Sequence, residues 1–408
     1  MDTASSPAGQ PAPPWLAERL RAAGGAVPFR TYMQWALHDP EHGAYGAGRL
    51  QVGPRGDFAT SPSLGPDFAA LLVPQIAQWL GQKPADVPLA LVETGPGEGS
   101  LALQLATALA EQWPQLAART SLLLVEPNAG MASRQRERLA ACPLPCRWLS
   151  FAELRQRPVH GVLLAHEVLD ALAVERIVWD GALWRQQQVV LHEGPDAQAS
   201  LRLEPGPPLE PSVLAQLEPL GLLNPGPQRP AGFSTELHPG LTPWLADAAA
   251  GLASGQLLVI DYAHEAWRYY APQRRNGTLM AYRQQQASDD PLLEPGHWDL
   301  TAHLCLESLQ AAAEAAGFTL LGQRRQGEAL LALGLAQRLH GLQQASGADL
   351  PELLSRREAL LRLVDPHTLG DFRWVALARD AAAAHLADGG PTPVPPPLPL
   401  FLQDPPLG

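Results

Sequence analysis

Residues 90–105 read ALVETGPGEGSLALQL and place glycines at positions 95, 97 and 99. The apolar residues before the glycines are typical of a short buried strand, and the leucines and alanines after them recur at helical spacing. Glycines in a loop between a strand and a helix allow a sharp turn and bring the backbone close to a ligand. The stretch therefore predicts a strand–loop–helix unit that binds a dinucleotide, a nucleotide phosphate or a nucleoside without phosphate.

The same alternation continues along the chain. Apolar runs at 120–127, 146–151, 159–167 and 254–263 each predict a strand, and helical patterns lie between several of them. Strands that alternate with helices of about 10–15 residues are typical of βαβ units, in which helices cover both faces of a parallel sheet. The sequence therefore predicts a nucleotide-type α/β fold with a mostly parallel sheet, an N-terminal extension and an internal insertion.

Some stretches depart from the alternation. Residues 176–206 read as paired antiparallel strands, and the proline-rich tail is a loose terminus, a docking strap or a ligand for a proline-reading groove. The predicted segments are a disordered N-terminus (1–14), a helical or lid extension (15–87), the first part of the core (88–185), inserted antiparallel strands and a loop (186–232), the remainder of the core with substrate-side elements (233–388) and the tail (389–408).

The composition of the 408-residue chain restricts the classes of function. Hydrophobic residues make up 46% and charged residues 17%, which suits one large or two smaller globular domains. The formal net charge is −12, and no cluster of lysines and arginines resembles a stripe that follows nucleic-acid phosphates. We therefore expect no nucleic-acid partner.

Cysteine usage and the N-terminus indicate a reducing compartment. Cys142, Cys146 and Cys305 lack a second ligand pair at zinc spacing, so we expect structural thiols and no metal. The N-terminus has neither the pattern of a secretory signal nor the arginines of a mitochondrial transit peptide. No run approaches about 18 apolar residues, the length of a membrane span. We expect a cytoplasmic enzyme without a membrane span, and we make no prediction of its oligomeric state.

The details of the glycine loop discriminate among the three ligands. The dinucleotide pattern G-x-G-x-x-G requires its third glycine at position 100, where this chain has Ser100. Pro96 lacks the backbone N–H that a pyrophosphate would use, and the loop has no lysine of the kind that a Walker A motif requires. Phosphate binding is therefore the weaker interpretation.

Two acids at successive strand ends fit a nucleoside that carries an amino acid and a sulfonium. Glu93 is placed to receive a charged amino group, and Glu126 ends the next strand, where a strand tip meets a ribose. This pattern favours S-adenosylmethionine over NAD. Two alternatives stay open. The loop is a purely structural turn, or Glu126 is a solvated acid at the strand end or the first-turn acid of the next helix, where the helix dipole favours it.

The glycine stretch also resembles a known motif. Residues 91–102, LVETGPGEGSLA, resemble motif I of class I S-adenosylmethionine-dependent methyltransferases, and more narrowly the E-x-G-P-G-x-G-x-L motif of the MidA-like family. That family includes a mitochondrial complex I assembly factor that is a protein arginine methyltransferase. The chain departs from the family pattern at His166, Ala173 and Ala263. Further blocks resemble family blocks in the expected order, at 29–48, 56–72, 166–176, 296–304 and 369–378.

The resemblance implies a Rossmann-like class I methyltransferase fold and transfer of a methyl group from S-adenosyl-L-methionine to a protein side chain, arginine above all. The implied partner is an arginine-containing segment of a protein, with a respiratory-complex subunit as one option. The alternative is a non-catalytic assembly or scaffold protein of a respiratory complex that retains the fold. The predicted cofactor-binding residues are Glu93, Gly95, Pro96, Gly97, Gly99 and Glu126.

Carboxylates suit the methylation of a guanidinium group. A pair of them matches the arginine fork and accepts the proton that is lost. Glu167 and Asp170 follow the strand at 159–167, and we predict that they are catalytic. Alternatively, Asp170 is a helix N-cap. The neighbouring His166 either titrates near neutral pH or replaces the family asparagine for packing reasons.

Five residues are predicted on the substrate side. The loop at 57–61 is expected to close over the active site, although its TSP sequence is also a helix-start signal. Asp299, Thr301 and His303 are further candidates, and for His303 we favour a buried structural role over that of a general base. The predicted substrate residues are Asp57, Phe58, Thr60, Ser61 and Asp261.

Overall fold

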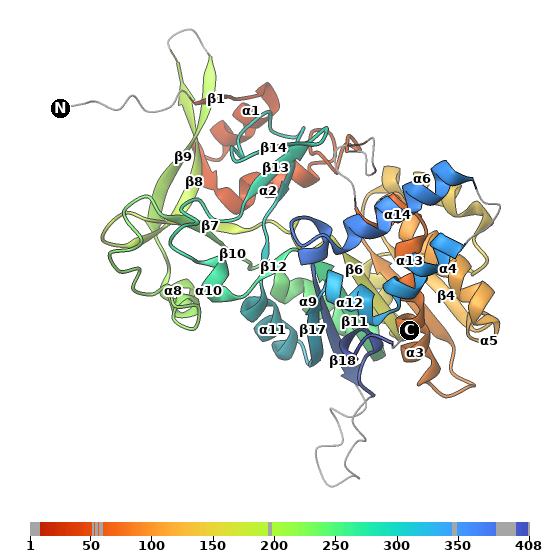
Figure 1. Cartoon of the computed structure of the whole chain (residues 1–408). Coiled ribbons are helices and arrows are strands. Elements are labelled where there is room, and N and C mark those ends of the chain that lie inside the picture. Colours follow the sequence, from red (N-terminus) through yellow and green to blue (C-terminus); the bar gives the residue numbers. More distant parts are fainter. Residues whose placement is uncertain are drawn as a thin grey trace. The chain divides into compact units, whose positions relative to one another are not determined.

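The computed structural model of the chain describes residues 9–50, 53, 56, 60–194, 198–344, 349–380 and 397–406. The chain divides into two compact units (Figure 1). Unit 1 comprises residues 1–51, 171–240 and 264–307, and unit 2 comprises residues 52–170, 241–263 and 308–408. Each unit is therefore assembled from three separate stretches of the chain.

Unit 2 is built on a seven-stranded sheet with the order β17-β18-β11-β6-β3-β4-β5. Strands β5, β4, β3, β6 and β11 pair in parallel, whereas β18 runs antiparallel to both of its neighbours. This confirms the predicted α/β fold with a mostly parallel sheet. The strands are β3 (Leu89–Thr94), β4 (Thr120–Val125), β5 (Cys146–Leu149), β6 (Val159–His166), β11 (Leu252–Asp261), β17 (Thr319–Arg325) and β18 (Arg373–Asp380).

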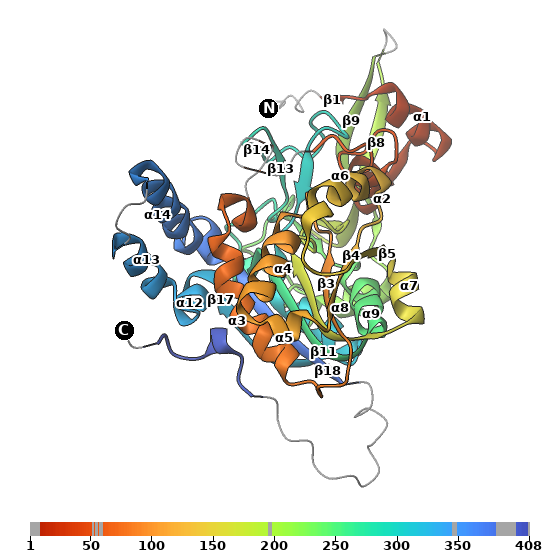
Figure 2. The ribbon, with the colours of Figure 1, turned by 90° about the vertical axis from the view of Figure 1, so that its right-hand side faces the viewer.

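Helices cover this sheet, and Figure 2 shows α3, α4 and α5 together on one side of it. Leu101, Leu105 and Leu109 recur every fourth residue of α4 and are all buried, because this spacing places them on one face of a helix. They join one core cluster with Leu91 and Leu122 of the sheet. The helices are α3 (Asp67–Gly81), α4 (Ser100–Gln112), α5 (Pro114–Ala117), α6 (Ala129–Arg138), α7 (Phe151–Gln156), α9 (Leu241–Gly251), α11 (Leu306–Ala315), α12 (Gln326–Ala332), α13 (Leu335–Gln344) and α14 (Leu350–Val364).

Unit 1 contains an antiparallel sheet with the order β1-β9-β8-β7-β10, and β2 also pairs with β8. The antiparallel pairing predicted for 176–206 is confirmed by β7, β8 and β9. The elements are β1 (Gln10–Pro11), α1 (Pro14–Ala22), β2 (Ala26–Pro28), α2 (Phe29–His38), β7 (Glu175–Trp179), β8 (Trp184–Glu193), β9 (Ala199–Pro208), α8 (Pro211–Leu217), β10 (Ser234–Leu237), α10 (Ala266–Tyr269), β13 (Met280–Arg283), β14 (Gln286–Ser288), β15 (Asp299–Thr301) and β16 (Leu304–Cys305), with β12 (Ala263–His264) at the boundary with unit 2.

The structure divides the chain differently from the predicted segments. Residues 26–28 of the predicted extension form β2 in the sheet of unit 1, and residues 264–307 of the predicted core also belong to unit 1. These assignments depend on pairing between strands that are far apart in the chain, which hydrophobic periodicity does not reveal. Within the described ranges, no helix has the length and apolar character needed to cross a membrane.

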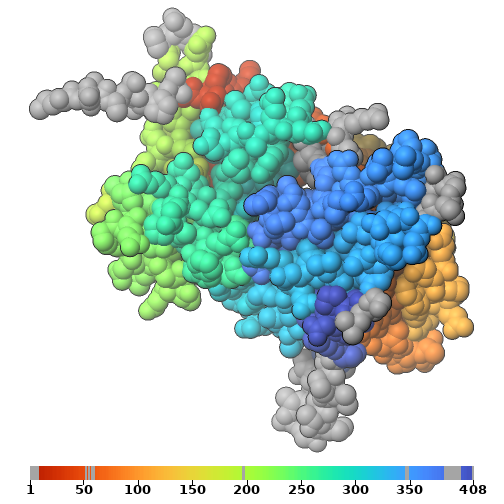
Figure 3. Space-filling model, viewed as in Figure 1, coloured from red at the N-terminus to blue at the C-terminus, as the bar shows by residue number. Residues whose placement is uncertain are grey.

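The last described residues, 397–406, lie on unit 2. Their short helix η5 (Leu400–Leu402) contacts α3, α12 and β17. In Figure 3 the dark blue atoms of this segment lie beside the lighter blue helices. Phe401 has no exposed surface, and its backbone N–H donates to Gln75 Oε1 at 3.2 Å. For these residues the structure favours the docking-strap alternative over a loose terminus; residues 389–396 lie outside the described residues.

Candidate active site

The glycine loop lies between β3 and α4 at the carboxyl end of the parallel strands. Gly95, Gly97 and Gly99 have φ angles of 55°, 53° and 77°. This left-handed region is open to glycine and strains other residues. A Cβ at Gly95 would also lie 3.0 Å from Val168 Cγ2, so the loop packs closely on the segment that follows β6. The Gly99 N–H donates to the Pro96 carbonyl at 2.7 Å, which closes the turn before α4.

Glu93 is the acid at the end of β3, and only 5% of its surface is exposed. Burial raises its pKa to about 8, against a smaller opposing effect of a backbone hydrogen bond from Ala102. Its Oε2 atom has no hydrogen-bond partner among the residues that the structure describes. A buried carboxylate oxygen without a donor is costly, and a cationic group from a ligand would satisfy it.

Glu126 follows β4 and is held by its neighbours. Its Oε1 accepts the Asn128 N–H at 2.8 Å, and its Oε2 accepts from Gln135 Nε2 at 3.0 Å. Burial raises its pKa. Helix α6 begins at Ala129 with Asn128 as its N-cap, so Glu126 precedes the helix and the first-turn alternative is wrong. The carboxylate is therefore fixed at the strand tip, where a ribose is expected.

Gln135 of α6 was not predicted as a site residue, yet it connects the predicted ones. Its Nε2 donates both to Glu126 and to the Gly97 carbonyl at 2.8 Å, and its Oε1 accepts from Trp148 Nε1 at 2.9 Å. Gln135 is completely buried, and all its donor and acceptor groups are used. The helical pattern of α6 predicted the helix, but no sequence signal distinguished the one glutamine that faces the loop.

Glu167 lies directly after β6 with a φ angle of 52°, which is rare for a residue with a side chain. Such strain tends to persist where the surrounding structure holds a functional group in place. Its backbone N–H donates to the Ile260 carbonyl at 2.9 Å. His166 Nε2 lies 3.5 Å from Glu167 Oε1. Burial lowers the pKa of His166 to about 3, so the alternative that this histidine titrates near neutral pH is wrong.

Asp170 and Asp261 form a second pair of acids. Asp261 Oδ2 accepts the backbone N–H groups of Leu169 and Asp170 at 3.0 and 3.2 Å, and its Oδ1 accepts that of Tyr262 at 2.8 Å. Burial and then the charge of Asp170 raise the pKa of Asp261 well above its ordinary value. No helix begins at Asp170, so the N-cap alternative is wrong. Asp261 holds the turn that carries Asp170, and its predicted contact with substrate stays a prediction.

Comparisons with known proteins agree with this geometry. The family model described as "Putative S-adenosyl-L-methionine-dependent methyltransferase" matches residues 71–324. The chain belongs to this family. The methyltransferase is 28% identical over 406 residues to "Protein arginine methyltransferase NDUFAF7 homolog, mitochondrial" of Drosophila melanogaster, covering 91% of this chain and 86% of the relative. It is 26% identical to the human protein arginine methyltransferase NDUFAF7, covering 91% and 85% of the two chains.

Two crystal structures of Burkholderia thailandensis proteins of one superfamily share the whole fold. One is bound to S-adenosyl-homocysteine, with 28% identity, a TM-score of 0.78 and coverage of 96% of the methyltransferase and 94% of that chain. The second is a native structure with 27% identity, a TM-score of 0.76 and the same coverage of both chains. The fold of the methyltransferase is therefore the class I fold, and its cofactor is S-adenosyl-L-methionine.

The residues around the loop fit this cofactor. The orphaned Oε2 of buried Glu93 suits the amino group, the fixed carboxylate of Glu126 suits two ribose hydroxyls, and the turn at 95–99 lets a nucleoside approach the backbone. When bound, S-adenosyl-L-methionine supplies an electrophilic methyl group. We predict that these residues hold it in the methyltransferase.

The block at 56–72 is only partly described, because Asp57 and Phe58 lie outside the described residues. Thr60 is the N-cap residue of the short helix η1 (Ser61–Leu64), as the helix-start alternative expected. Ser61 is fully buried, and its hydroxyl accepts from Gln326 Nε2 at 3.2 Å. Ser61 thus has an internal partner, and the contact of this block with substrate stays a prediction.

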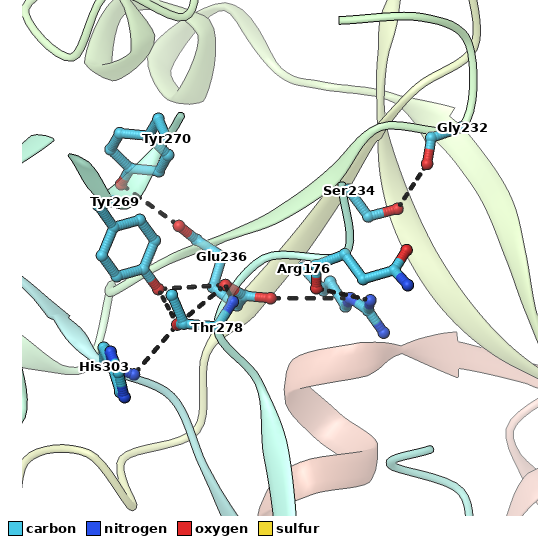
Figure 4. Close-up of polar contacts among 9 residues, drawn as sticks. Arg176, Gly232, Ser234, Glu236, Tyr269, Tyr270, Thr278 and His303 are labelled. Atoms are coloured by element: carbon cyan, nitrogen blue, oxygen red, sulfur yellow. Dashed lines mark hydrogen bonds and ion pairs between the residues drawn. The ribbon is translucent and has the colours of Figure 1, made fainter. Parts of the chain in front are cut away.

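The block at 296–304 lies in unit 1 of the methyltransferase, and its His303 contacts a polar cluster that includes Thr278 and Tyr269 (Figure 4). The His303 N–H donates to Thr278 Oγ1 at 3.1 Å, and Thr278 Oγ1 also donates to Tyr269 Oη at 2.9 Å. His303 Nδ1 lies 3.1 Å from His264 Nε2, and burial lowers the pKa of His303 to about 3. These contacts favour the structural role for His303.

Proposed function

We propose that the methyltransferase transfers the methyl group to arginine side chains of a protein. The observation that carries this proposal is the placement of Glu167 and Asp170 directly after β6, on the segment that packs against Gly95. Two carboxylates match the planar fork of a guanidinium group better than they match an ammonium group. The names of the Drosophila and human relatives support the same acceptor.

Glu167 and Asp170 have distinct roles in this proposal. Glu167, with about 10% of its side chain exposed, orients the guanidinium nitrogen and accepts the proton that the nitrogen loses. Asp170 is 5% exposed and is anchored by Asp261, so it fixes the other side of the guanidinium group. Neutral His166 adds no competing positive charge beside Glu167.

The test is methyl transfer by the purified full-length protein to arginine-containing and lysine-containing protein segments. Analysis of the labelled amino acids should give methylarginine. Glu167→Gln should lower the transfer rate by about 100-fold or more, because a positioned acid or base contributes about that much. The same variant should bind S-adenosyl-homocysteine as the wild type does.

Glu111→Gln is the matched control, because Glu111 is an exposed acid on α4 and should leave the rate unchanged. Label found only on lysine would overturn the arginine assignment. If wild type and Glu167→Gln both bind the cofactor and neither transfers a methyl group to any protein, the non-catalytic scaffold alternative is favoured.

A further inference from the structure

The docked C-terminal segment occupies a site that is shaped to receive it. Arg324 Nη1 donates to the carbonyls of Phe401 and Gln403 at 3.1 and 2.7 Å. A Cβ at Gly322 would clash with Leu402 Cδ1, so the leucine fills the space that the glycine leaves open. Together with the bond from Phe401 to Gln75, these contacts fix the backbone and the side chains of the segment.

Phe401 packs on Trp374 of β18, which is itself completely buried. The two ring centroids are 5.5 Å apart with an edge-on geometry. Trp374 Nε1 donates to Gln326 Oε1 at 3.2 Å, and Gln326 Nε2 donates to Ser61 Oγ at 3.2 Å. Through Trp374, the docked segment is thus connected to the block at 56–72, which the sequence predicts on the substrate side.

A second connection runs from Trp374 to the end of β6. The Trp374 ring meets the Phe68 ring edge-on at 6.1 Å, and Phe68 meets His166 edge-on at 5.4 Å. His166 is followed directly by Glu167 and by Val168, the side chain against which Gly95 packs. A shift of Trp374 would therefore displace the glycine loop, because buried side chains are close-packed and transmit displacement.

We propose that residues 397–406 are a positioning element for the cofactor site of the methyltransferase. Docking of Phe401 on Trp374 fixes Phe68 and His166, and through them the turn at 167–168 that supports the glycine loop. Undocking loosens that turn and weakens cofactor binding. This inference rests on cofactor binding and not on arginine as the acceptor, so the two proposals fail separately.

The experiment compares Phe401→Ala with Phe318→Ala in the full-length chain. Phe318 is a buried phenylalanine of unit 2 that takes part in none of these ring contacts. Both substitutions remove a buried ring and should lower Tm by roughly 10 °C. Calorimetric titration with S-adenosyl-homocysteine, at a temperature where circular dichroism shows all variants folded, then measures the effect on the site.

Phe401→Ala should raise Kd for S-adenosyl-homocysteine by roughly 3- to 30-fold, the range of coupling energies seen between distant sites. Phe318→Ala should leave Kd within about twofold of the wild type. Equal Kd values for the two variants would overturn the proposal, since the segment would then contribute stability alone.

Arg324→Gln provides a second route if Phe401→Ala does not fold. It removes two hydrogen bonds that hold the segment and alters none of the aromatic residues around Trp374. Hydrogen exchange of the Leu402 and Gln403 amides should report undocking, with a parallel rise in Kd. Undocking without any change in Kd would overturn the proposal.

A double-mutant cycle then tests the route through His166. The double variant carries both His166→Asn and Phe401→Ala. If Phe401 acts through the His166 ring, the rise in Kd of the double variant should be at least about twofold smaller than the product of the rises that each substitution causes alone. Strictly multiplicative effects would exclude this route and overturn the positioning mechanism as stated.

Discussion

Glu93 in unit 2 and Glu236 in unit 1 are both buried glutamates, with 5% and 0% of their surfaces exposed. Glu236 Oε2 accepts from the Thr278 N–H at 2.9 Å and from Tyr269 Oη at 3.1 Å, and Arg176 Nε lies 3.9 Å from Glu236 Oε1. Glu93 Oε2 has no hydrogen-bond partner within the part of the chain that the structure describes. Glu236 Oε1 also lacks a hydrogen bond among the described residues, but the guanidinium group of Arg176 supplies Glu236 with a countercharge. Among the same residues no ion pair is found for Glu93, so its carboxyl group is the one left for a cationic ligand group, which separates a structural carboxylate from a binding one.

The largest expected effect is on the structural carboxylate. Glu236→Gln should lower the free energy of unfolding by about 3–5 kcal/mol, because it leaves the charge of buried Arg176 without its partner. Guanidinium chloride titration of the variant and the wild type measures the difference. The matched control is Glu210→Gln, an exposed acid of unit 1, which should stay within about 0.5 kcal/mol of the wild type. If the two variants are equally stable, Glu236 is not a structural carboxylate of unit 1.

The next effect is on the binding carboxylate. Glu93→Gln should raise Kd for S-adenosyl-homocysteine by roughly 10- to 100-fold, since a hydrogen bond between charged groups contributes about 1.5–3 kcal/mol. Glu98→Gln changes an acid in the same loop that is paired with Arg134 at 3.5 Å, and it should alter Kd by less than about threefold. If Glu93→Gln binds as tightly as the wild type, Glu93 does not receive the amino group.

The smallest effect is a dependence of stability on pH. Burial raises the pKa of Glu93 from 4.5 to about 8, so the folded protein retains a proton that the unfolded chain has lost. The contribution of this group is therefore fully present below pH 4.5 and is lost as the pH rises through about 8. Between pH 7 and pH 8 the ligand-free wild type should lose up to about 1 kcal/mol relative to Glu93→Gln. Parallel stability curves of the two proteins over this range would contradict the raised pKa.

Local sequence patterns were sufficient for the parallel core and for much of the cofactor loop. The strand–loop–helix unit at 90–105 predicted β3, the turn and α4, because apolar periodicity and glycine preference are properties of adjacent residues. The two acids Glu93 and Glu126 were found because parallel strands end at one edge of a sheet. These features need no knowledge of what packs against them.

Features that depend on long-range contacts were missed. Gln135 donates to the carbonyl of Gly97, 38 positions earlier in the chain. Its helix carries several other polar residues, and the sequence does not show which of them faces the loop. The anchoring of the Asp170 turn by Asp261 joins residues 91 positions apart. The membership of 264–307 in unit 1 likewise follows from contacts such as Thr278 to Glu236, 42 positions apart. A single sequence carries no signal for such pairs.

The division of each unit into three chain segments has a consequence for synthesis. Strand β2 at Ala26–Pro28 pairs with residues 188–190 of β8, and Gln75 meets Phe401 across 326 positions. Neither unit reaches its native contacts until late in translation, and chains dominated by distant contacts fold slowly. The nascent chain therefore exposes apolar surface for most of its elongation, and we expect its release from the ribosome to be followed by a slow, chaperone-sensitive folding phase.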